Sequence, residues 1–90
     1  MDAARSVAAQ GLDASSLARF EALRAWRASV ARAQGVPAYV IFHDAHLADI
    51  ARAAPRSKTE LARVPGLGES KLRRYAADLL VILGLEQPAV

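Results

Sequence analysis

The stretch from residue 61 to residue 74 holds the residue types in this chain that are best suited to chemistry. Two segments with helical spacing flank the turn Pro65-Gly66-Leu67-Gly68, and Lys71 and Arg74 follow it. Two glycines around one apolar residue let the backbone turn tightly and approach a partner closely. The N–H groups and the positive dipole at the start of the next helix can then hold a phosphate. The pattern therefore indicates contact with a nucleic-acid backbone, independent of base sequence.

Positive charge is concentrated around this turn. The net charge is +3, but residues 1–51 hold five Arg and five acidic residues, whereas residues 52–74 hold seven basic and two acidic residues. The candidate phosphate-binding residues are Arg56, Lys58, Arg63, Gly66, Gly68, Ser70, Lys71 and Arg74. Two observations count against this interpretation: such glycines can simply connect two helices, and the carboxylate of Glu69 would compete for the same N–H groups.

Other chemistry is largely excluded. The chain has no cysteine, so disulfides, thiolate metal sites and cysteine nucleophiles are absent. His43, His46 and Asp49 are spaced i, i+3, i+6, but i and i+6 diverge by about 120° on a helix. We therefore interpret them as a solvated helix face. We predict no metal, no cofactor and no catalytic site.

Length and composition indicate one small soluble domain. Ninety residues with 53% hydrophobic and 23% charged side chains are typical of a globular protein. The longest apolar run, Leu79–Leu83, is far shorter than the roughly 20 residues of a membrane span. The start of the chain lacks the apolar segment of a signal peptide. We expect a cytoplasmic, nucleoid-associated protein, and the excess of Arg over Lys would suit a GC-rich bacterial genome.

The strongest helical signal lies between Asp13 and Gly35. Apolar residues recur there every three or four positions and predict a helix of about 20 residues, with Arg19, Arg24, Arg27 and Arg32 interleaved. The apolar positions are Leu17, Phe20, Leu23, Trp26 and Val30. Trp26 could stack on a base, but at this spacing a core position is favoured. Residues 2–10, between Asp2 and Gly11, are either a short extra helix or a linker.

The second half of the chain predicts shorter elements. Residues 36–42 have strand propensity, but Pro37 and the lack of a partner strand favour a connector with at most one helical turn. Asp44 would cap a helix that Pro55 ends. Residues 57–60, Ser-Lys-Thr-Glu, form a capping box for a short helix. A last helix would run from about residue 69 to 83, with Gly84 as its C-cap.

Taken in order, these segments resemble the HRDC (helicase and RNase D C-terminal) domain, in its RecQ-family form. The resemblance covers roughly residues 15–83. It rests on the runs Leu23-Arg24-Ala25-Trp26-Arg27 and Val36-Pro37-Ala38-Tyr39-Val40-Ile41-Phe42, on Asp44-Ala45-His46-Leu47, and on Val64-Pro65-Gly66-Leu67-Gly68 with Lys71, Leu72 and Tyr75.

The resemblance implies an all-α fold, a compact bundle of about five helices with a helix-hairpin-helix-like turn. We expect a domain at 13–84, preceded by a linker or short helix at 1–12 and followed by a tail at 85–90. It also implies an accessory, monomeric domain of a RecQ-type helicase that binds single-stranded or branched DNA weakly. Tyr39 would lie among its DNA contacts, where a ring can stack on a base. A half-buried Tyr with only its hydroxyl at the surface is the alternative.

A second function remains open from the sequence. The domain could dock on the catalytic core of its parent helicase, or on another partner, without binding DNA itself. The balanced charge of residues 1–51 favours this reading. The chain has no Walker A sequence, and it lacks the clustered carboxylates that a metal-dependent nuclease would need.

Overall fold

The computed structural model describes residues 7–85, and every regular element among them is helical. A 3₁₀ turn, η1 (Val7–Ala9), precedes five α-helices. These are α1 (Ala14–Gln34), α2 (Ala38–Ile41), α3 (Asp44–Ala53), α4 (Lys58–Ala62) and α5 (Glu69–Leu85). The predicted all-α class with about five helices is confirmed. No helix in residues 7–85 is long and apolar enough to cross a membrane.

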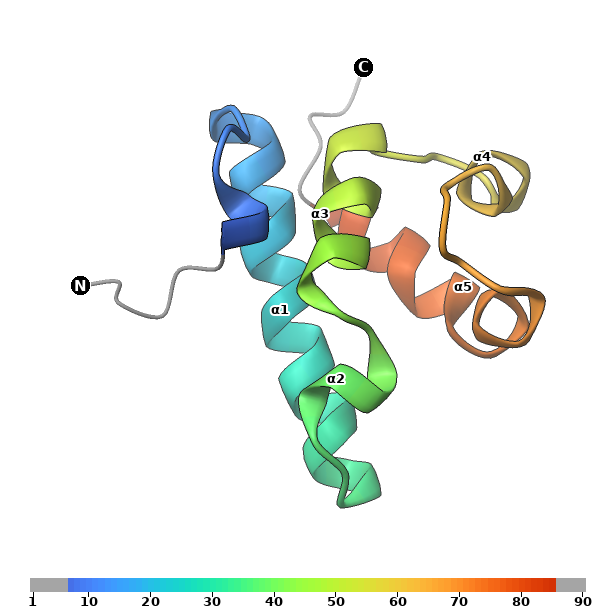
Figure 1. Cartoon of the computed structure of the whole chain (residues 1–90). Helices are drawn as coiled ribbons and strands as arrows, with labels where there is room; N and C mark the ends of the chain where they lie inside the picture. The colour runs from blue at the N-terminus through green and yellow to red at the C-terminus, as the bar shows by residue number, and fades with distance from the viewer. Residues whose placement is uncertain (1–6, 86–90) are drawn as a thin grey trace.

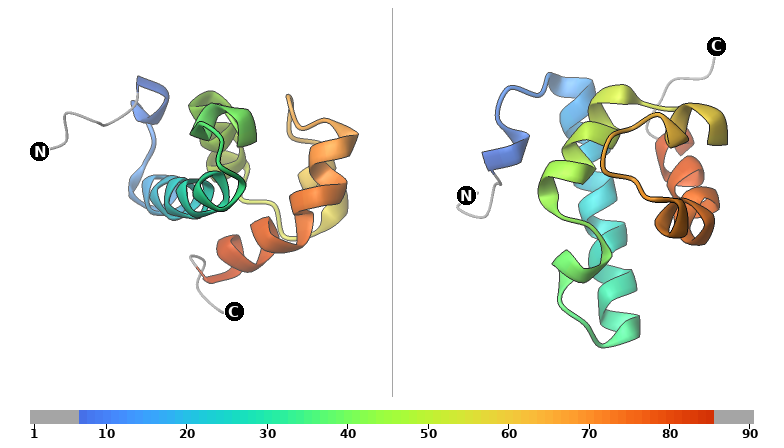
Figure 2. Two further views of the ribbon diagram at one scale, coloured as in Figure 1. Left: turned by 90° about the horizontal axis from the view of Figure 1, so that it is seen from below. Right: turned by 45° about the vertical axis from the view of Figure 1, so that its right-hand side comes forward.

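The long helix α1 is the spine of the molecule. The chain turns back after α1, so that α2 and α3 lie along its side, and α5 packs against it from another direction (Figure 1). η1 packs against α3, and α4 packs against α5 (Figure 2). The hairpin between α4 and α5 therefore lies on the side of the molecule away from η1.

One hydrophobic core joins all five helices. Its fully buried side chains come from α1 (Phe20, Leu23), from α2 and the residue after it (Ile41, Phe42), from α3 (Leu47, Ile50), from α4 (Leu61) and from α5 (Leu79, Leu83). Leu17, Trp26 and Val30, which the spacing placed in the core, are partly buried against it. The predicted apolar stripe of α1 is thus correct in its central residues and half-exposed at its edges.

Two arginines of α1 are buried, contrary to their interpretation as interleaved surface residues. Arg19 and Arg27 are only 9% and 8% exposed. Phe20, Leu23 and Arg27 stand at i, i+3 and i+7, so Arg27 belongs to the buried face. Arg19 donates from Nε to the Ala51 carbonyl at 2.7 Å and from Nη2 to Ser16 Oγ at 3.1 Å. The bond to Ala51 joins α1 to α3, and the bond to Ser16 holds the guanidinium in place from within α1.

Both ends of α1 are capped. The Asp13 carboxylate accepts a hydrogen bond from the Ser16 N–H at 2.8 Å. That bond, helped by the Ser16 hydroxyl, lowers the pKa of Asp13 below its usual value. Gly35 ends the helix in the left-handed region, at φ 68°, and its N–H bonds back to α1 carbonyls.

Two predicted helix ends need correction. Asp44 is the first residue of α3 rather than its cap, because its carboxylate pairs with Arg27 at 2.7 Å and His43 takes the N-cap position. Gly84 does not end α5, which continues to Leu85. A helical glycine costs only about 1 kcal/mol, too little to stop an established helix. The predicted start of α4 is confirmed: Ser57 is its N-cap and its hydroxyl accepts from the Glu60 N–H, while the Glu60 carboxylate accepts from the Arg56 N–H at 2.8 Å.

The N-terminal prediction falls partly outside the described residues. Of the helix expected at residues 2–10, the structure describes only η1 and the turn to Gly11, in which Ala9 is buried in the core cluster. Asp2 and the predicted tail from residue 86 onward lie outside the described range.

Ala54 ends α3 in a conformation that suits glycine better. It is the only non-glycine residue with positive φ among residues 7–85, at φ 47° and ψ 53°. We expect Ala54→Gly to raise the free energy of unfolding by about 0.5 kcal/mol, because glycine avoids the left-handed penalty of roughly 1–2 kcal/mol but adds unfolded-chain entropy. Urea denaturation measures this. Ala53→Gly, one residue earlier and helical, should instead destabilise; equal losses in the two variants would contradict the assignment.

Candidate nucleic-acid interface

The short helix α2 presents one apolar face to solvent and one to the core. Tyr39 is 61% exposed and Val40 is 45% exposed, whereas Ile41 and the following Phe42 are each 1% exposed. The predicted single helical turn after Pro37 is confirmed. A helix of four residues does not persist by itself. Its orientation, and with it the position of the Tyr39 ring, must come from tertiary contacts.

Two cations from different helices supply those contacts. Lys71 of α5 donates from Nζ to the Val40 carbonyl at 2.9 Å and to the Ile41 carbonyl. Arg27 of α1 donates from Nη1 to the Phe42 carbonyl at 2.8 Å. Three successive carbonyls at the end of α2 therefore accept from cationic side chains. We call Lys71, Arg27 and these three carbonyls the carbonyl clamp.

Further contacts support each cation of the clamp. Arg27 pairs through Nη2 with the Asp44 carboxylate at 2.7 Å, although its Nε is buried without a hydrogen-bond partner. The Lys71 ammonium lies 5.0 Å from the centroid of the Phe42 ring, within cation–π range. The clamp thus joins α1, α2, the start of α3 and α5 around Phe42.

Aromatic rings fill the space beneath the clamp. The ring centroid of Trp26 lies 6.1 Å from that of Phe42 and 5.4 Å from that of Tyr75, and the centroids of Phe42 and Tyr75 are 5.8 Å apart. Such spacings are typical of packed aromatic pairs. The interpretation of Trp26 as a packing residue, rather than a base-stacking one, is confirmed. Among the Phe, Tyr and Trp rings of residues 7–85, it leaves Tyr39 as the exposed one.

A line of rings runs from Tyr39 toward the hairpin. The Tyr39 and His43 rings are near-parallel, at 25°, with centroids 6.1 Å apart. His46 meets His43 edge-on, with centroids 5.7 Å apart. We call Tyr39, His43 and His46 the ring row. Of the predicted solvated face, His43 is exposed and His46 is partly buried, and both also take part in ring contacts. In residues 7–85, no three His, Asp or Glu side chains form a group that could hold a metal.

The Gly-x-Gly turn packs against the end of the ring row. Gly66 has φ 85°, and a Cβ placed on it would lie 2.7 Å from both Cδ2 and Nε2 of His46. Gly66 is therefore needed both for its backbone angle and for the closeness of the imidazole. A Cβ placed on Gly68 would meet no atom within 4 Å, and the φ of Gly68 is not positive. The structure therefore does not require glycine at this position. Leu67 is partly buried against the core, as expected for the residue between the glycines.

Several basic residues around the hairpin have partners within the protein, so fewer of them can bind a phosphate than their number suggests. Arg52 pairs with Asp49 at 3.1 Å, and Arg73 pairs with Glu69 at 3.2 Å. Lys71 belongs to the clamp. The guanidinium of Arg74 lies 5.6 Å from the Tyr75 ring centroid. Glu69 thus stands in the first turn of α5 with a cation beside it, at the point where the sequence placed a phosphate.

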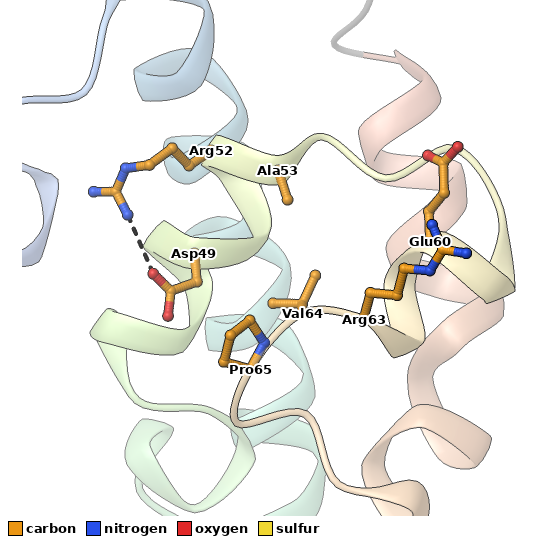
Figure 3. A pocket seen from close by; sticks show the side chains of 7 residues that line it. All are labelled: Asp49, Arg52, Ala53, Glu60, Arg63, Val64 and Pro65. Carbon is orange, nitrogen blue, oxygen red and sulfur yellow. Dashed lines mark hydrogen bonds and ion pairs between the residues drawn. The ribbon is translucent and has the colours of Figure 1, made fainter.

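Arg63 lines an open pocket of about 340 Å³ between α3, α4 and the start of the hairpin. Figure 3 shows Val64 and Pro65 in its middle, the Arg52–Asp49 pair on the α3 side, and Arg63 with Glu60 on the α4 side. Two arginines and two carboxylates balance in charge there. Lys58 lines a separate pocket of about 290 Å³, together with Glu69 and Arg73.

The structure brings some of the predicted site residues together and separates others. Tyr39 and Lys71 meet through the backbone of α2, and Gly66 joins the ring row through His46. Arg56, Lys58, Arg63, Ser70 and Arg74 are exposed at several places around α4 and α5. Sequence reasoning missed Arg27 and the ring row. The available signals were the place of Arg27 on the apolar stripe of α1 and the four-residue spacing of Tyr39 and His43.

The fold defines a class: a small all-α domain whose five helices share one hydrophobic core. The family model "HRDC domain" matches residues 16–83, so the chain belongs to the HRDC family. The solved structure titled "D. radiodurans RecQ HRDC domain 3" is similar, with a TM-score of 0.74 and 36% identity. That match covers 78% of this chain and 92% of the other. The suspected family is therefore confirmed.

Curated relatives carry the domain within much longer proteins. ATP-dependent DNA helicase UvrD2 of Mycobacterium tuberculosis is 43% identical over 61 residues, which are 68% of this chain and 9% of that protein. ATP-dependent DNA helicase RecQ of Pasteurella multocida is 34% identical over 64 residues, 71% of this chain and 10% of that protein. This chain therefore spans about a tenth of the curated relatives that it matches.

The carbonyl clamp makes Lys71 a structural residue, and its loss should show in stability. We expect Lys71→Met, which keeps the aliphatic stem, to lower the free energy of unfolding by about 1–2 kcal/mol, because hydrogen bonds from a charged donor are lost. Arg73→Met, which breaks only an exposed i,i+4 pair, should change it by at most about 0.5 kcal/mol. Urea denaturation compares the two. Similar small effects would mean that Lys71 does not hold α2.

Proposed function

We propose that this domain binds single-stranded DNA weakly, through base stacking on Tyr39 and nearby phosphate contacts, and so tunes the substrate choice of its parent helicase. The observation that carries the proposal is the position of Tyr39. Its ring is 61% exposed on a four-residue helix whose carbonyls are held from behind by Lys71 and Arg27. A large ring held rigidly in solvent is typical of a contact site rather than of packing.

Stacking rather than charge would then supply much of the affinity. A stacked base contributes about 1–3 kcal/mol, whatever its sequence. The charge of residues 52–74 is reduced by the Arg52–Asp49 and Arg73–Glu69 pairs, so few phosphate contacts are available. We therefore infer an affinity in the weak range of roughly 10⁻⁴–10⁻⁶ M at physiological salt. Binding of this kind would not read base sequence.

The residues of the hairpin remain the predicted phosphate contacts. Lys58, Arg63 and Arg74 are exposed, and the N–H groups that follow Gly68 begin a helix of 17 residues. Lys71 is better explained as a support for Tyr39. A domain of this kind would act beside the motor of a helicase, in the cytoplasm and near the nucleoid.

One observation favours the alternative, docking on the parent helicase. Val81 and Leu85 are 64% and 79% exposed and stand four residues apart on α5. They therefore lie on a different helix from Tyr39, which belongs to α2. An exposed apolar pair on one helix face suits contact with another protein surface. Docking through α5 and DNA binding through α2 would use different elements and are compatible.

Titration of a fluorescent dT oligonucleotide of about 12 nucleotides, at rising salt, tests the proposal. We expect Tyr39→Ala to weaken binding at least about fivefold, as for one lost base stack. Tyr39→Phe keeps the ring and should retain wild-type affinity, and Val81→Ala controls for a general loss of exposed apolar surface. Absence of binding even at low salt would overturn the proposal and leave docking as the function.

A further inference from the structure

We propose that His43 is the second ring of the base-stacking surface, so that Tyr39 and His43 together hold two nucleobases of a single strand. This inference rests on the DNA-binding function proposed above and extends it. Both rings are exposed, and their planes differ by only 25°. Near-parallel rings with centroids 6.1 Å apart are too close to admit a base between them, so each base would stack on an outward π-face of its own ring.

The position of His43 in the fold leaves its side chain available for this use. His43 is the N-cap residue of α3, where an oxygen-bearing side chain would ordinarily bond the first N–H groups. Here the His43 side chain makes no capping hydrogen bond. The imidazole therefore contributes little to ending the helix, and another planar ring could replace it without loss of a cap.

Neighbours on both sides hold the His43 ring in its orientation. Tyr39 lies along one side, and His46 meets it edge-on at 82°. His46 in turn has the Gly66 backbone so close that a Cβ there would clash. The hairpin thus fixes the His43 ring through His46, as the carbonyl clamp fixes Tyr39 through α2. Rings ordered in advance lose little entropy when a base stacks on them.

Abasic DNA separates stacking from charge. The test compares a dT oligonucleotide with one of equal length whose central sugars carry no bases, so that both have the same phosphates. We expect His43→Ala to weaken dT binding at least about fivefold and to leave abasic binding unchanged. His43→Phe, a ring without a titratable charge, should keep dT affinity within about twofold. Amide spectra of each variant check that the fold is retained.

The outcomes distinguish this inference from the function on which it rests. If the wild-type chain does not bind dT, both fail. If Tyr39→Ala weakens dT binding and His43→Ala does not, DNA binding stands and the role of His43 is wrong. If His43→Ala weakens dT and abasic binding equally, or if His43→Phe binds as poorly as His43→Ala, the imidazole acts through its charge or hydrogen bonds, and stacking is overturned.

Discussion

Two side-chain cations donate hydrogen bonds to three successive backbone carbonyls, and the exposed surface around α2 depends on these bonds. The chain must leave α1, turn at Gly35, and return along α1 to start α3. It does so through a single helical turn too short to hold its own shape. The Lys71 ammonium and the Arg27 guanidinium take the carbonyls of residues 40–42, which a longer helix would satisfy internally. Tyr39 and Val40 face outward because the opposite side of α2 is bonded inward.

Hydrogen bonds to backbone carbonyls also explain why this domain buries two arginines. Arg19 and Arg27 lie on the inner face of α1, where each meets a backbone carbonyl of another element at 2.7–2.8 Å. A buried cation is tolerable only when it is well bonded. In this domain those bonds connect neighbouring segments of the fold. Arg19, Arg27 and Lys71 therefore hold the fold together, whereas exposed basic residues such as Lys58, Arg63 and Arg74 can meet an anionic partner.

The sequence predicts the helices well and the roles of its cations poorly. Apolar spacing and turn residues locate α1, α3 and α5, and Pro37 correctly argues against a strand, because these signals are local. Lys71 bonds carbonyls 30 and 31 residues away, and nothing in its neighbourhood along the chain indicates that. The prediction that it binds phosphate follows from its charge, from its place after the turn and from the family resemblance. Asp44 was misplaced as a cap for the same reason, since its partner Arg27 lies on another helix.

The candidate site likewise contains residues that the sequence predicts and residues that it misses. The resemblance to the HRDC family predicts Tyr39 as a DNA contact, and its exposure in the structure makes it the leading candidate. The ring row could not be predicted, because the approach of Gly66 to His46 depends on how the hairpin packs on α3. The sequence predicts that Gly66 lets the backbone approach a phosphate. In the structure the group that lies close to Gly66 is the His46 imidazole.

The salt dependence of DNA binding by Lys71→Met tests most directly whether Lys71 holds α2 or a phosphate. A cation that contacts single-stranded DNA contributes about 0.7 to the slope of log K against log salt concentration. If Lys71 acts through the carbonyl clamp, Lys71→Met weakens binding while the slope stays equal to that of the wild-type chain. A slope shallower by about 0.7, with affinity lost only at low salt, would show that Lys71 neutralises a phosphate and would contradict this account.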